Sequence, residues 1–409
     1  MENAPEVLLL NPRPNDYLSL LNERELVNIF KHLDLYELLQ ISELDVNYQR
    51  IIGERIISKQ TLDVSKVSRH YDTRQLFKQF GEYVTDLKVH ESDIQYKDDQ
   101  YTFIEEIFRL INKRCTVGRL KSISIGLNRE AQHMIRTVPN VFCEISSLSV
   151  YGDYFGQLSN LLEQVIPKCS KLCSLEITRM SGNWNFLISP QLQMLQTLEI
   201  KYCQIPHSVW AHFIRIGIQS LTSLVIKQNA FSFDEPETPM EKVTRTWLAN
   251  SIGIKFPNLK ELVLINCHPG LLFDGSKFTQ LEKISFNARG MLFISDSIKY
   301  MTNLRSVEFS EYSTISVFED FLQLPLLSEF ILNAHDIGAN VITAIVAASR
   351  YLRVLRLNSR KPRIAWTLYN ELVIERATRW PDAPPLHMYA RFKDFQRHKP
   401  NVITIHRIN

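Results

Sequence analysis

The chain has 409 residues, which exceeds the size of one ordinary hydrophobic core and predicts either several domains or an elongated repeat array. Hydrophobic residues make up 45% of the sequence and charged residues 22%, a composition that excludes a disordered or fibrous chain. The formal net charge of +3 is too small to indicate nucleic acid or a membrane surface as the general partner.

The N-terminal tail, residues 1 to 17, has no features of a secretory signal. Its apolar run from Val7 to Leu10 is short and follows acidic residues instead of basic ones. No apolar run elsewhere approaches the roughly 18 residues that span a bilayer. Six scattered cysteines without a CxxC pair indicate free thiols in a reducing compartment. We therefore expect a cytoplasmic or nuclear protein without membrane contact.

Residues 18 to 56 are predicted to form two or three short helices. Asn22 is a plausible N-cap for the first helix, and Asp34 for the second. The first helix has an apolar stripe at helical spacing, formed by Leu26, Ile29, Phe30 and Leu33. The second has one formed by Leu38, Leu39, Ile41 and Leu44. Because such short helices cannot enclose a core alone, some of this apolar surface should contact a partner.

This segment resembles an F-box, whose pattern is Leu-Pro-x-x-x-Leu-x-x-Ile-Phe followed by further apolar positions. Asn22 stands where the family has its helix-starting Pro, and Tyr48 stands where Trp or Phe is usual. The resemblance implies binding to the Skp-type adaptor and, through it, to the cullin and RING subunits of an SCF (Skp, cullin, F-box) ubiquitin ligase. The implied adaptor contacts are Leu21, Leu26, Ile29, Phe30, Leu33, Leu35 and Leu38. Taken alone, such a stripe is more often simple core, so the repeats that follow give the interpretation its specificity.

From residue 57 onward, a six-residue phrase, apolar-x-x-apolar-x-apolar, recurs down the chain. Its ten clear copies begin at Leu120, Ile145, Leu172, Leu195, Leu221, Leu259, Leu281, Leu304, Leu327 and Leu352. The steps between them are 22 to 27 residues, except for one of 38, which is typical of leucine-rich repeats. Weaker copies begin near Leu62 and Val84 and include Ile403. The alternative is a series of unrelated α/β units, which would not explain why the same six-residue phrase recurs at a nearly constant spacing.

Each phrase predicts a short strand whose last two apolar residues point inward. Segments between the strands have helical spacing, which predicts a covering layer of helices, as at Gly156 to Val165 and Gly338 to Ala348. The predicted fold class is therefore α/β. A short N-terminal helical F-box-like segment precedes an irregular leucine-rich-repeat solenoid over residues 57 to 409, with a parallel strand layer on its concave face. The consensus Asn or Cys after the phrase remains only at Cys203, Asn229 and Cys267, which resembles the irregular repeats of intracellular F-box proteins. We expect these cysteines to be buried structural thiols.

Strand geometry identifies which residues face outward on the concave side and therefore which are candidates for substrate binding. These candidates are Glu176, Glu199, Val225, Val263, Ile265 and Arg356. An exposed apolar patch formed by the two valines and Ile265 would favour a protein ligand, unless helices or the C-terminal tail cover it. The 38-residue step contains an acidic, Pro-containing loop, Phe231 to Met240, and an expected helix, Glu241 to Ser251. This insertion either lines a binding face or is tolerated surface variation.

The C-terminal end is the basic pole of the chain. Residues 350 to 409 contain 13 Lys or Arg against 4 Asp or Glu, and because the whole chain is +3, residues 1 to 349 carry −6. Arg356 would pair with a phosphorylated or acidic target segment. The alternative is that Arg353, Arg356, Arg360, Lys361 and Arg363 are solvated or paired with repeat acids. A nucleic-acid partner is disfavoured by the mild total charge and the lack of an evident stacking platform.

Motifs for chemistry are missing from the sequence: it has no HExxH, paired CxxC, Gly-rich phosphate loop or GxSxG. We therefore predict no catalytic residues, no metal site and no cofactor. The favoured hypothesis is a non-catalytic substrate receptor of an SCF-type ligase, which binds an unidentified target protein. A leucine-rich-repeat scaffold that binds proteins without ligase assembly is the second hypothesis, and an enzyme the third. Co-purification of the adaptor distinguishes the first two.

Overall fold

The computed structural model describes residues 17–64, 70–90, 100–126, 140–152, 158–227, 251–265, 272–287, 292–293, 295–310, 320–334, 337–359, 366–390 and 402–407. The chain forms two compact units, the first comprising Met1–Gly126 with His133–Ile145 and the second Leu127–Gln132 with Ser146–Asn409. Residues 18 to 56 therefore share a unit with the segment that follows them. The division of the chain at residue 56 stays a prediction.

Three short α-helices begin the first unit after a 3-10 turn, and their bounds are η1 Tyr17–Leu20, α1 Glu23–Phe30, α2 Leu35–Ser42 and α3 Val46–Arg55. Asn22 Oδ1 accepts a hydrogen bond from the Glu25 amide at 3.1 Å, and the Glu25 carboxylate accepts one from the Asn22 amide at 2.9 Å. Asp34 and Glu37 repeat this arrangement at the start of α2, both at 2.8 Å. Both predicted N-caps are confirmed, each as a reciprocal capping box.

The rest of the first unit alternates helices with parallel strands. Its elements are η2 Ile57–Lys59, β1 Thr61–Asp63, α4 His70–Phe80, η4 Gly81–Tyr83, β2 Asp86–His90, α5 Gln100–Arg114, β3 Ser122–Gly126 and η6 Asn140–Glu144. Strand β2 pairs with both β1 and β3, placing Leu62, Leu87 and Ile123 in one row. All three side chains are buried, so the weak phrase copies near Leu62 and Val84 do form repeat strands.

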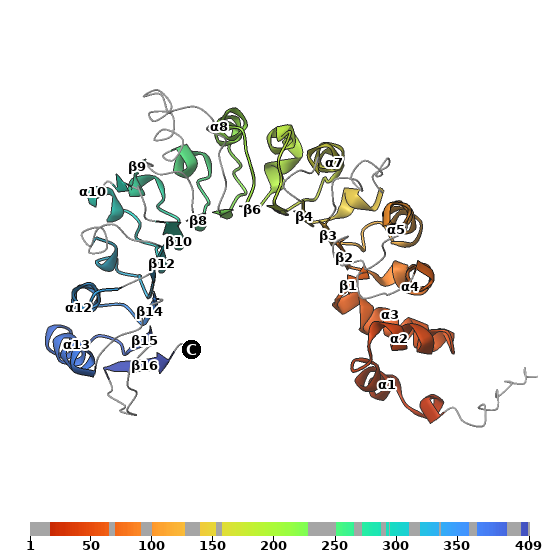
Figure 1. The fold of residues 1–409 in the computed structure, drawn as a ribbon, viewed down its shortest axis with the longest axis horizontal. Helices are drawn as coiled ribbons and strands as arrows, with labels where there is room; N and C mark the ends of the chain where they lie inside the picture. Colours follow the sequence, from red (N-terminus) through yellow and green to blue (C-terminus); the bar gives the residue numbers. More distant parts are fainter. Residues whose placement is uncertain are drawn as a thin grey trace, which may run out of the picture. The chain divides into compact units, whose positions relative to one another are not determined.

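In the second unit, parallel strands follow one another in chain order. They are β4 Ser147–Tyr151, β5 Ser174–Thr178, β6 Thr197–Lys201, β7 Ser223–Lys227, β8 Glu261–Ile265, β10 Lys283–Asn287, β12 Ser306–Ser310, β13 Glu329–Ala334, β14 Val354–Ser359, β15 Leu386–Ala390 and β16 Ile403–Arg407. A separate two-stranded sheet contains β9 Leu272–Phe273 and β11 Leu292–Phe293. Within this unit the strands lie along the inner side of a curved layer, and helices lie along the outer side (Figure 1).

The covering segments of the second unit are short. They are α7 Leu158–Val165, η7 Ile166–Lys168, η8 Asn185–Ile188, η9 Pro190–Met194, α8 His207–Ile216, η10 Gly275–Lys277, α10 Ser295–Ile298, α12 Ala339–Ala348 and α13 Trp366–Arg379. Helices α7 and α12 fall within the two segments for which helical spacing was noted. The acidic loop Phe231 to Met240 lies outside the described residues, as does all but the last residue of the expected helix Glu241 to Ser251.

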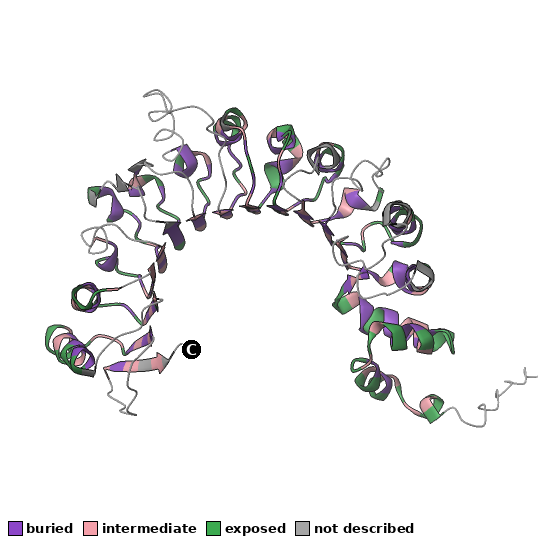
Figure 2. Cartoon of the chain, in the orientation of Figure 1, coloured by how far each residue is buried: buried purple, intermediate pink, exposed green. Residues whose placement is uncertain are grey.

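Every one of the ten clear phrases forms a strand that begins at the third residue of the phrase. The fourth and sixth residues point into the core, as Leu198 and Ile200 do in β6, where both are fully buried. Figure 2 shows this buried layer between the strands and the covering segments of the second unit. The α/β leucine-rich-repeat fold is therefore confirmed.

Close stacking of neighbouring repeats requires glycine at the end of α8. Gly217 has a φ of 70°, and a Cβ added there would lie 2.7 Å from the Lys255 carbonyl oxygen. An L side chain would be strained in this conformation and would also collide with backbone of the next repeat. Gly217 therefore fixes how closely these two repeats approach.

Candidate functional site

The predicted adaptor contacts divide into buried and accessible side chains. Leu26, Phe30 and Leu38 are buried, and the Phe30 ring packs edge-to-face on Tyr48 with centroids 5.9 Å apart. Leu21, Leu33 and Leu35 are half-buried, whereas Ile29 is 41% exposed. Part of the stripe is thus internal core of the first unit, and a rigid partner reaches only the remaining part. The role of these residues in adaptor binding stays a prediction.

Large apolar side chains are exposed on the same helical segment. They are Tyr17, Leu20, Ile29, Tyr36, Leu44 and Val46, which we call the apolar helical surface. Val46 is 80% exposed although it begins α3. Single exposed apolar residues are ordinary, whereas contiguous exposed apolar patches mark contact surfaces, and these six lie within 30 residues of one small helical segment. Sequence periodicity singled out Ile29 and Leu44 but not Tyr36 and Val46, which lie outside the stripes.

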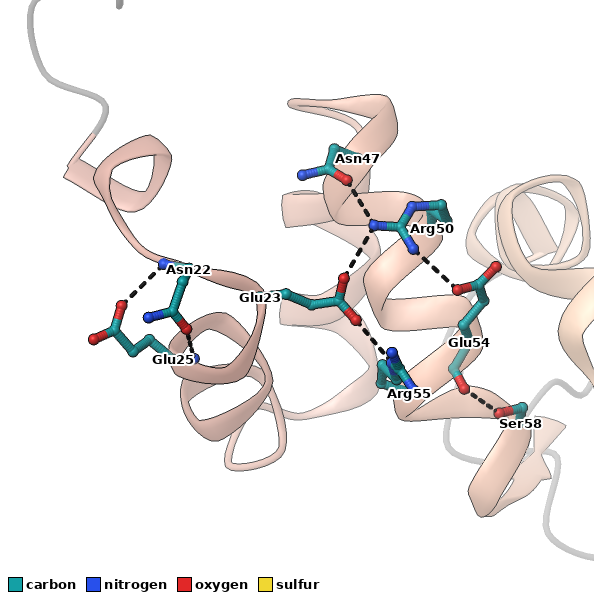
Figure 3. A network of polar contacts seen from close by, with 8 residues as sticks. All are labelled: Asn22, Glu23, Glu25, Asn47, Arg50, Glu54, Arg55 and Ser58. Carbon is teal, nitrogen blue, oxygen red and sulfur yellow. Dashed lines mark hydrogen bonds and ion pairs between the residues drawn. The ribbon is translucent and has the colours of Figure 1, made fainter.

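An ionic network joins α1 to α3 (Figure 3). The Glu23 carboxylate accepts hydrogen bonds from Arg55 Nε at 2.8 Å and from Arg50 Nη2 at 3.3 Å. Arg50 also donates to Glu54 at 3.0 Å and to Asn47 at 3.0 Å. The hydrogen bonds from Arg55 and Arg50 hold the pKa of Glu23 below its ordinary value. The network links α1 and α3 at their surface, in addition to the buried contact between Phe30 and Tyr48.

On the strand face of the second unit, Glu176 is the centre of a polar cluster. It accepts hydrogen bonds from Ser149 Oγ at 3.0 Å, from the Tyr151 hydroxyl at 3.1 Å and from Lys201 Nζ at 3.0 Å. Lys201 also pairs with Glu199 at 2.7 Å. We call these five residues the Glu176 cluster. It contains two carboxylates and one ammonium group, so it keeps a net negative charge.

Ionisation in the Glu176 cluster follows from these contacts. Burial raises the pKa of Glu176, but the hydrogen bond and charge of Lys201, with the two hydroxyl donors, outweigh it and hold the pKa below 4.5. Burial likewise lowers the pKa of Lys201, while Glu199 and Glu176 outweigh it and hold the pKa above 10.5. Both groups are therefore charged across the neutral range, and the cluster is a fixed pattern of donors and acceptors.

The predicted apolar patch in the middle of the face is wrong for Val225 and Val263. Their side chains are 7% and 5% exposed, and the two residues pair in register between β7 and β8. Ile265 is half-buried. In register, Val225 lies between the longer Glu199 and Val263, and Val263 lies between Val225 and Ser285. These valines pack the sheet and offer little surface to a partner.

Arg356 lies on the strand face as predicted, but its charge is already paired. Its Nε donates to Glu329 at 3.1 Å, and its guanidinium carbon lies 4.5 Å from the Tyr389 ring centroid. This agrees with the alternative in which basic residues pair with repeat acids. Arg353 is exposed, whereas Arg360, Lys361 and Arg363 lie outside the described residues.

Cross-strand ion pairs recur along the strand face of the second unit. Glu261 on β8 pairs with Lys283 on β10 at 2.8 Å, just as Glu176 pairs with Lys201 and Glu329 with Arg356. In each case the acid precedes the base by one strand. The face is therefore close to neutral over much of its length, which disfavours a polyanionic partner.

Two of the described cysteines, Cys115 and Cys203, are buried thiols. Burial raises the pKa of Cys115 and of Cys203 to about 12, so neither is a thiolate at neutral pH. Cys203 Sγ accepts a hydrogen bond from the Met180 amide at 3.3 Å and donates to the Lys201 carbonyl at 3.1 Å. Cys203 is the buried structural thiol that its position predicted, while Asn229 and Cys267 lie outside the described residues.

Across the described ranges, three or more His, Cys, Asp or Glu side chains nowhere gather as a metal-binding group. Of the helices that can be described, none has both the length and the hydropathy needed to cross a bilayer.

The chain is similar in structure to several solved proteins. It is 15% identical to a chain of the yeast Rad7–Elc1 complex, with a TM-score of 0.46 over 82% of this chain and 88% of that one. It is 11% identical to the APL1 leucine-rich-repeat domain, with a TM-score of 0.36 over 82% and 87% of the two chains. For the leucine-rich-repeat protein LegL7 of Legionella pneumophila the identity is 10% and the TM-score 0.34, over 81% and 94%. No protein-family model matches the chain, and no curated protein does. The similarity concerns the fold alone.

Proposed function

We propose that this chain is the substrate-recognition subunit of an SCF-type ubiquitin ligase. In this proposal the N-terminal helices dock on a Skp-type adaptor, which links the chain to cullin and RING subunits, and the strand face of the second unit holds the target protein. The observation that carries the proposal is the apolar helical surface, which lies within the segment that resembles an F-box.

The adaptor half of the proposal rests on the accessible residues and not on the whole predicted stripe. Ile29 is the one predicted contact that is clearly exposed, and Tyr36 and Val46 extend the apolar surface around it. The capping boxes at Asn22 and Asp34 and the Glu23 network hold α1 to α3 in a defined arrangement before binding. Such preorganisation lowers the entropy that docking would cost. Asn22 therefore replaces the helix-starting Pro without loss of the helix.

The target half of the proposal rests on the pattern of the strand face. Fixed donors and acceptors in the Glu176 cluster provide specific hydrogen bonding, and Glu199 supplies an additional acceptor. Of the six predicted substrate contacts, Glu176, Glu199 and Arg356 remain the accessible polar candidates, and Lys201 joins them. A near-neutral polar face fits a folded protein or peptide better than nucleic acid.

Surface and core variants of the helical segment test the adaptor half. Ile29→Asp places a charge on the apolar helical surface. If Ile29 is an interface anchor that contributes about 2 kcal/mol of binding free energy, its loss would weaken adaptor binding by at least about tenfold. Ile374→Asp is the matched control, because Ile374 is also exposed but lies on α13 of the second unit. The measurement is calorimetric titration of the full chain with purified Skp-type adaptor.

The expected result is weaker binding by Ile29→Asp, with an unchanged melting temperature, and binding by Ile374→Asp that equals the wild type. Phe30→Ala should instead lower the melting temperature, because Phe30 is fully buried. Equal affinity of Ile29→Asp and wild type would remove Ile29 from the interface. A wild-type chain without adaptor affinity would support the second candidate, a repeat scaffold that binds proteins outside a ubiquitin ligase.

A further inference from the structure

The last two strands of the second unit bring two histidines together. His387 Nδ1 and His406 Nε2 lie 3.1 Å apart, and the ring planes are 31° from parallel. His406 is two positions beyond the residue that pairs with His387, because the register matches His387 with Thr404 and Tyr389 with His406. Both side chains are half-buried on the face opposite the buried Leu386 and Met388. Two nitrogens from different strands therefore meet at a surface that water reaches.

Neighbouring rings hold this pair in place. His406 stacks on Tyr389, with ring centroids 4.4 Å apart and planes 14° from parallel, and Arg356 lies over the same tyrosine ring. Tyr369 on α13 donates its hydroxyl hydrogen to the Ile403 carbonyl at 2.9 Å and so anchors the start of β16. The imidazole of His406 is thus oriented by a stack that extends over β14, β15 and β16. A ligand set held this way loses little side-chain entropy on binding.

The chemistry of facing imidazole nitrogens allows two occupants. A single proton shared between the nitrogens gives a hydrogen bond, as in any neutral imidazole pair. When the donor ring carries its proton on its other nitrogen instead, both facing nitrogens present lone pairs, 3.1 Å apart. In a tetrahedral zinc site with Zn–N bonds of about 2.0–2.1 Å, two ligand nitrogens lie about 3.3 Å apart, close to the separation found here. Imidazole is also a preferred ligand of nickel and copper.

We propose that His387 and His406 form a two-histidine binding site for a divalent transition-metal ion of the zinc class, with water completing the coordination. The ion binds Nδ1 of His387 and Nε2 of His406, and the ring that donated the hydrogen bond then holds its proton on its other nitrogen, so both imidazoles stay neutral. Because the two ligands come from adjacent strands, the bound ion cross-links β15 to β16 and stabilises the C-terminal end of the repeat array. This site is independent of adaptor docking, and its test does not involve the adaptor.

Equilibrium dialysis of the full, tag-free chain against Zn²⁺ and, separately, Ni²⁺ measures the number of ions bound. Wild type should bind one ion per chain more than His387→Gln or His406→Gln. His212→Gln is the matched control, because His212 is an exposed histidine of the same unit with its side chain away from the pair, and it should bind as wild type does. Identical binding curves for wild type and both pair variants would overturn the proposal.

Hydrogen exchange of the wild-type chain provides a readout that needs no variant. With saturating Zn²⁺, amides of β15 and β16 should exchange more slowly, while those of β4 and β5 should be unaffected. Unchanged exchange in β15 and β16 would overturn the proposal, since an ion held by both strands must oppose their separation.

Discussion

Replacement of Leu198 by alanine tests whether the repeats share one continuous core. Leu198 lies in the middle of β6, has no exposed surface and pairs in register with Leu175 on β5 and Leu224 on β7, which are also fully buried. Removing most of a buried leucine side chain costs about 2–5 kcal/mol, through lost transfer free energy and the cavity that remains. Rigid flanking strands limit collapse of the cavity, so we expect the upper half of that range.

The assay is urea-induced unfolding of the full chain, followed by circular dichroism. Because each repeat is stabilised chiefly by its neighbours, Leu198→Ala should lower the midpoint of a transition that includes several repeats. Thr197→Ala is the matched control: Thr197 is the adjacent residue of β6, half-buried on the opposite face, and its replacement should change stability by no more than about 0.5 kcal/mol. Equal midpoints for Leu198→Ala and Thr197→Ala would refute the shared core.

Two further predictions concern charged side chains. Glu176 has a lowered pKa, so its contribution to stability is present at neutral pH and is lost as pH falls through that pKa. Lys201→Met should move this loss to higher pH in melting curves from pH 3 to 7, and it should cost no more than about 1 kcal/mol at neutral pH because the pair is partly exposed. Lys168→Met, at an exposed lysine on η7 of the same unit, should leave the acid limb unchanged, and a shift common to both variants would contradict the ion pair. Arg376 is buried and donates hydrogen bonds to three backbone carbonyls. Arg376→Met should therefore lower the free energy of unfolding in urea by about 3 kcal/mol. If the exposed Arg379→Met lowers it by as much, these hydrogen bonds contribute little.

The repeat strands were predictable because the six-residue phrase encodes strand and burial together. Leu198 and Ile200 of β6 are buried for the same local reason as Leu355 and Leu357 of β14. Strand β15 was missed, since Met388 pairs with the fourth phrase residue Leu355, which places Pro385 at the first position of the β15 phrase and hides the pattern. The local signal thus fails where a single non-apolar residue replaces its first leucine.

The strand face was less predictable because its character depends on neighbours distant in sequence. Alternation correctly placed Glu176 and Arg356 on the face, but their partners lie 25 and 27 residues away, on adjacent strands. Val225 also points toward this face and is still buried, in register between the longer Glu199 and Val263. Periodicity predicts the direction of a side chain, whereas its exposure depends on the size of the side chains next to it on adjacent strands.

In the helical segment, the caps were local and were predicted from Asn22 and Asp34. The division of the stripe into buried Phe30 and exposed Ile29 was not, because it depends on how α3 packs across α1. Adjacent residues of one apolar stripe therefore have different roles, and only the structure separates core from surface.

Assembly of the chain into a cullin complex tests the proposed function most directly. Purified full-length chain is mixed with a cullin–RING pair, with and without the Skp-type adaptor, and the species are separated by size-exclusion chromatography with light scattering. We predict that the chain co-elutes with cullin and RING only when the adaptor is present, and that Ile29→Asp weakens this co-elution while Ile374→Asp does not. A chain that elutes alone while adaptor, cullin and RING assemble without it would contradict the proposed function.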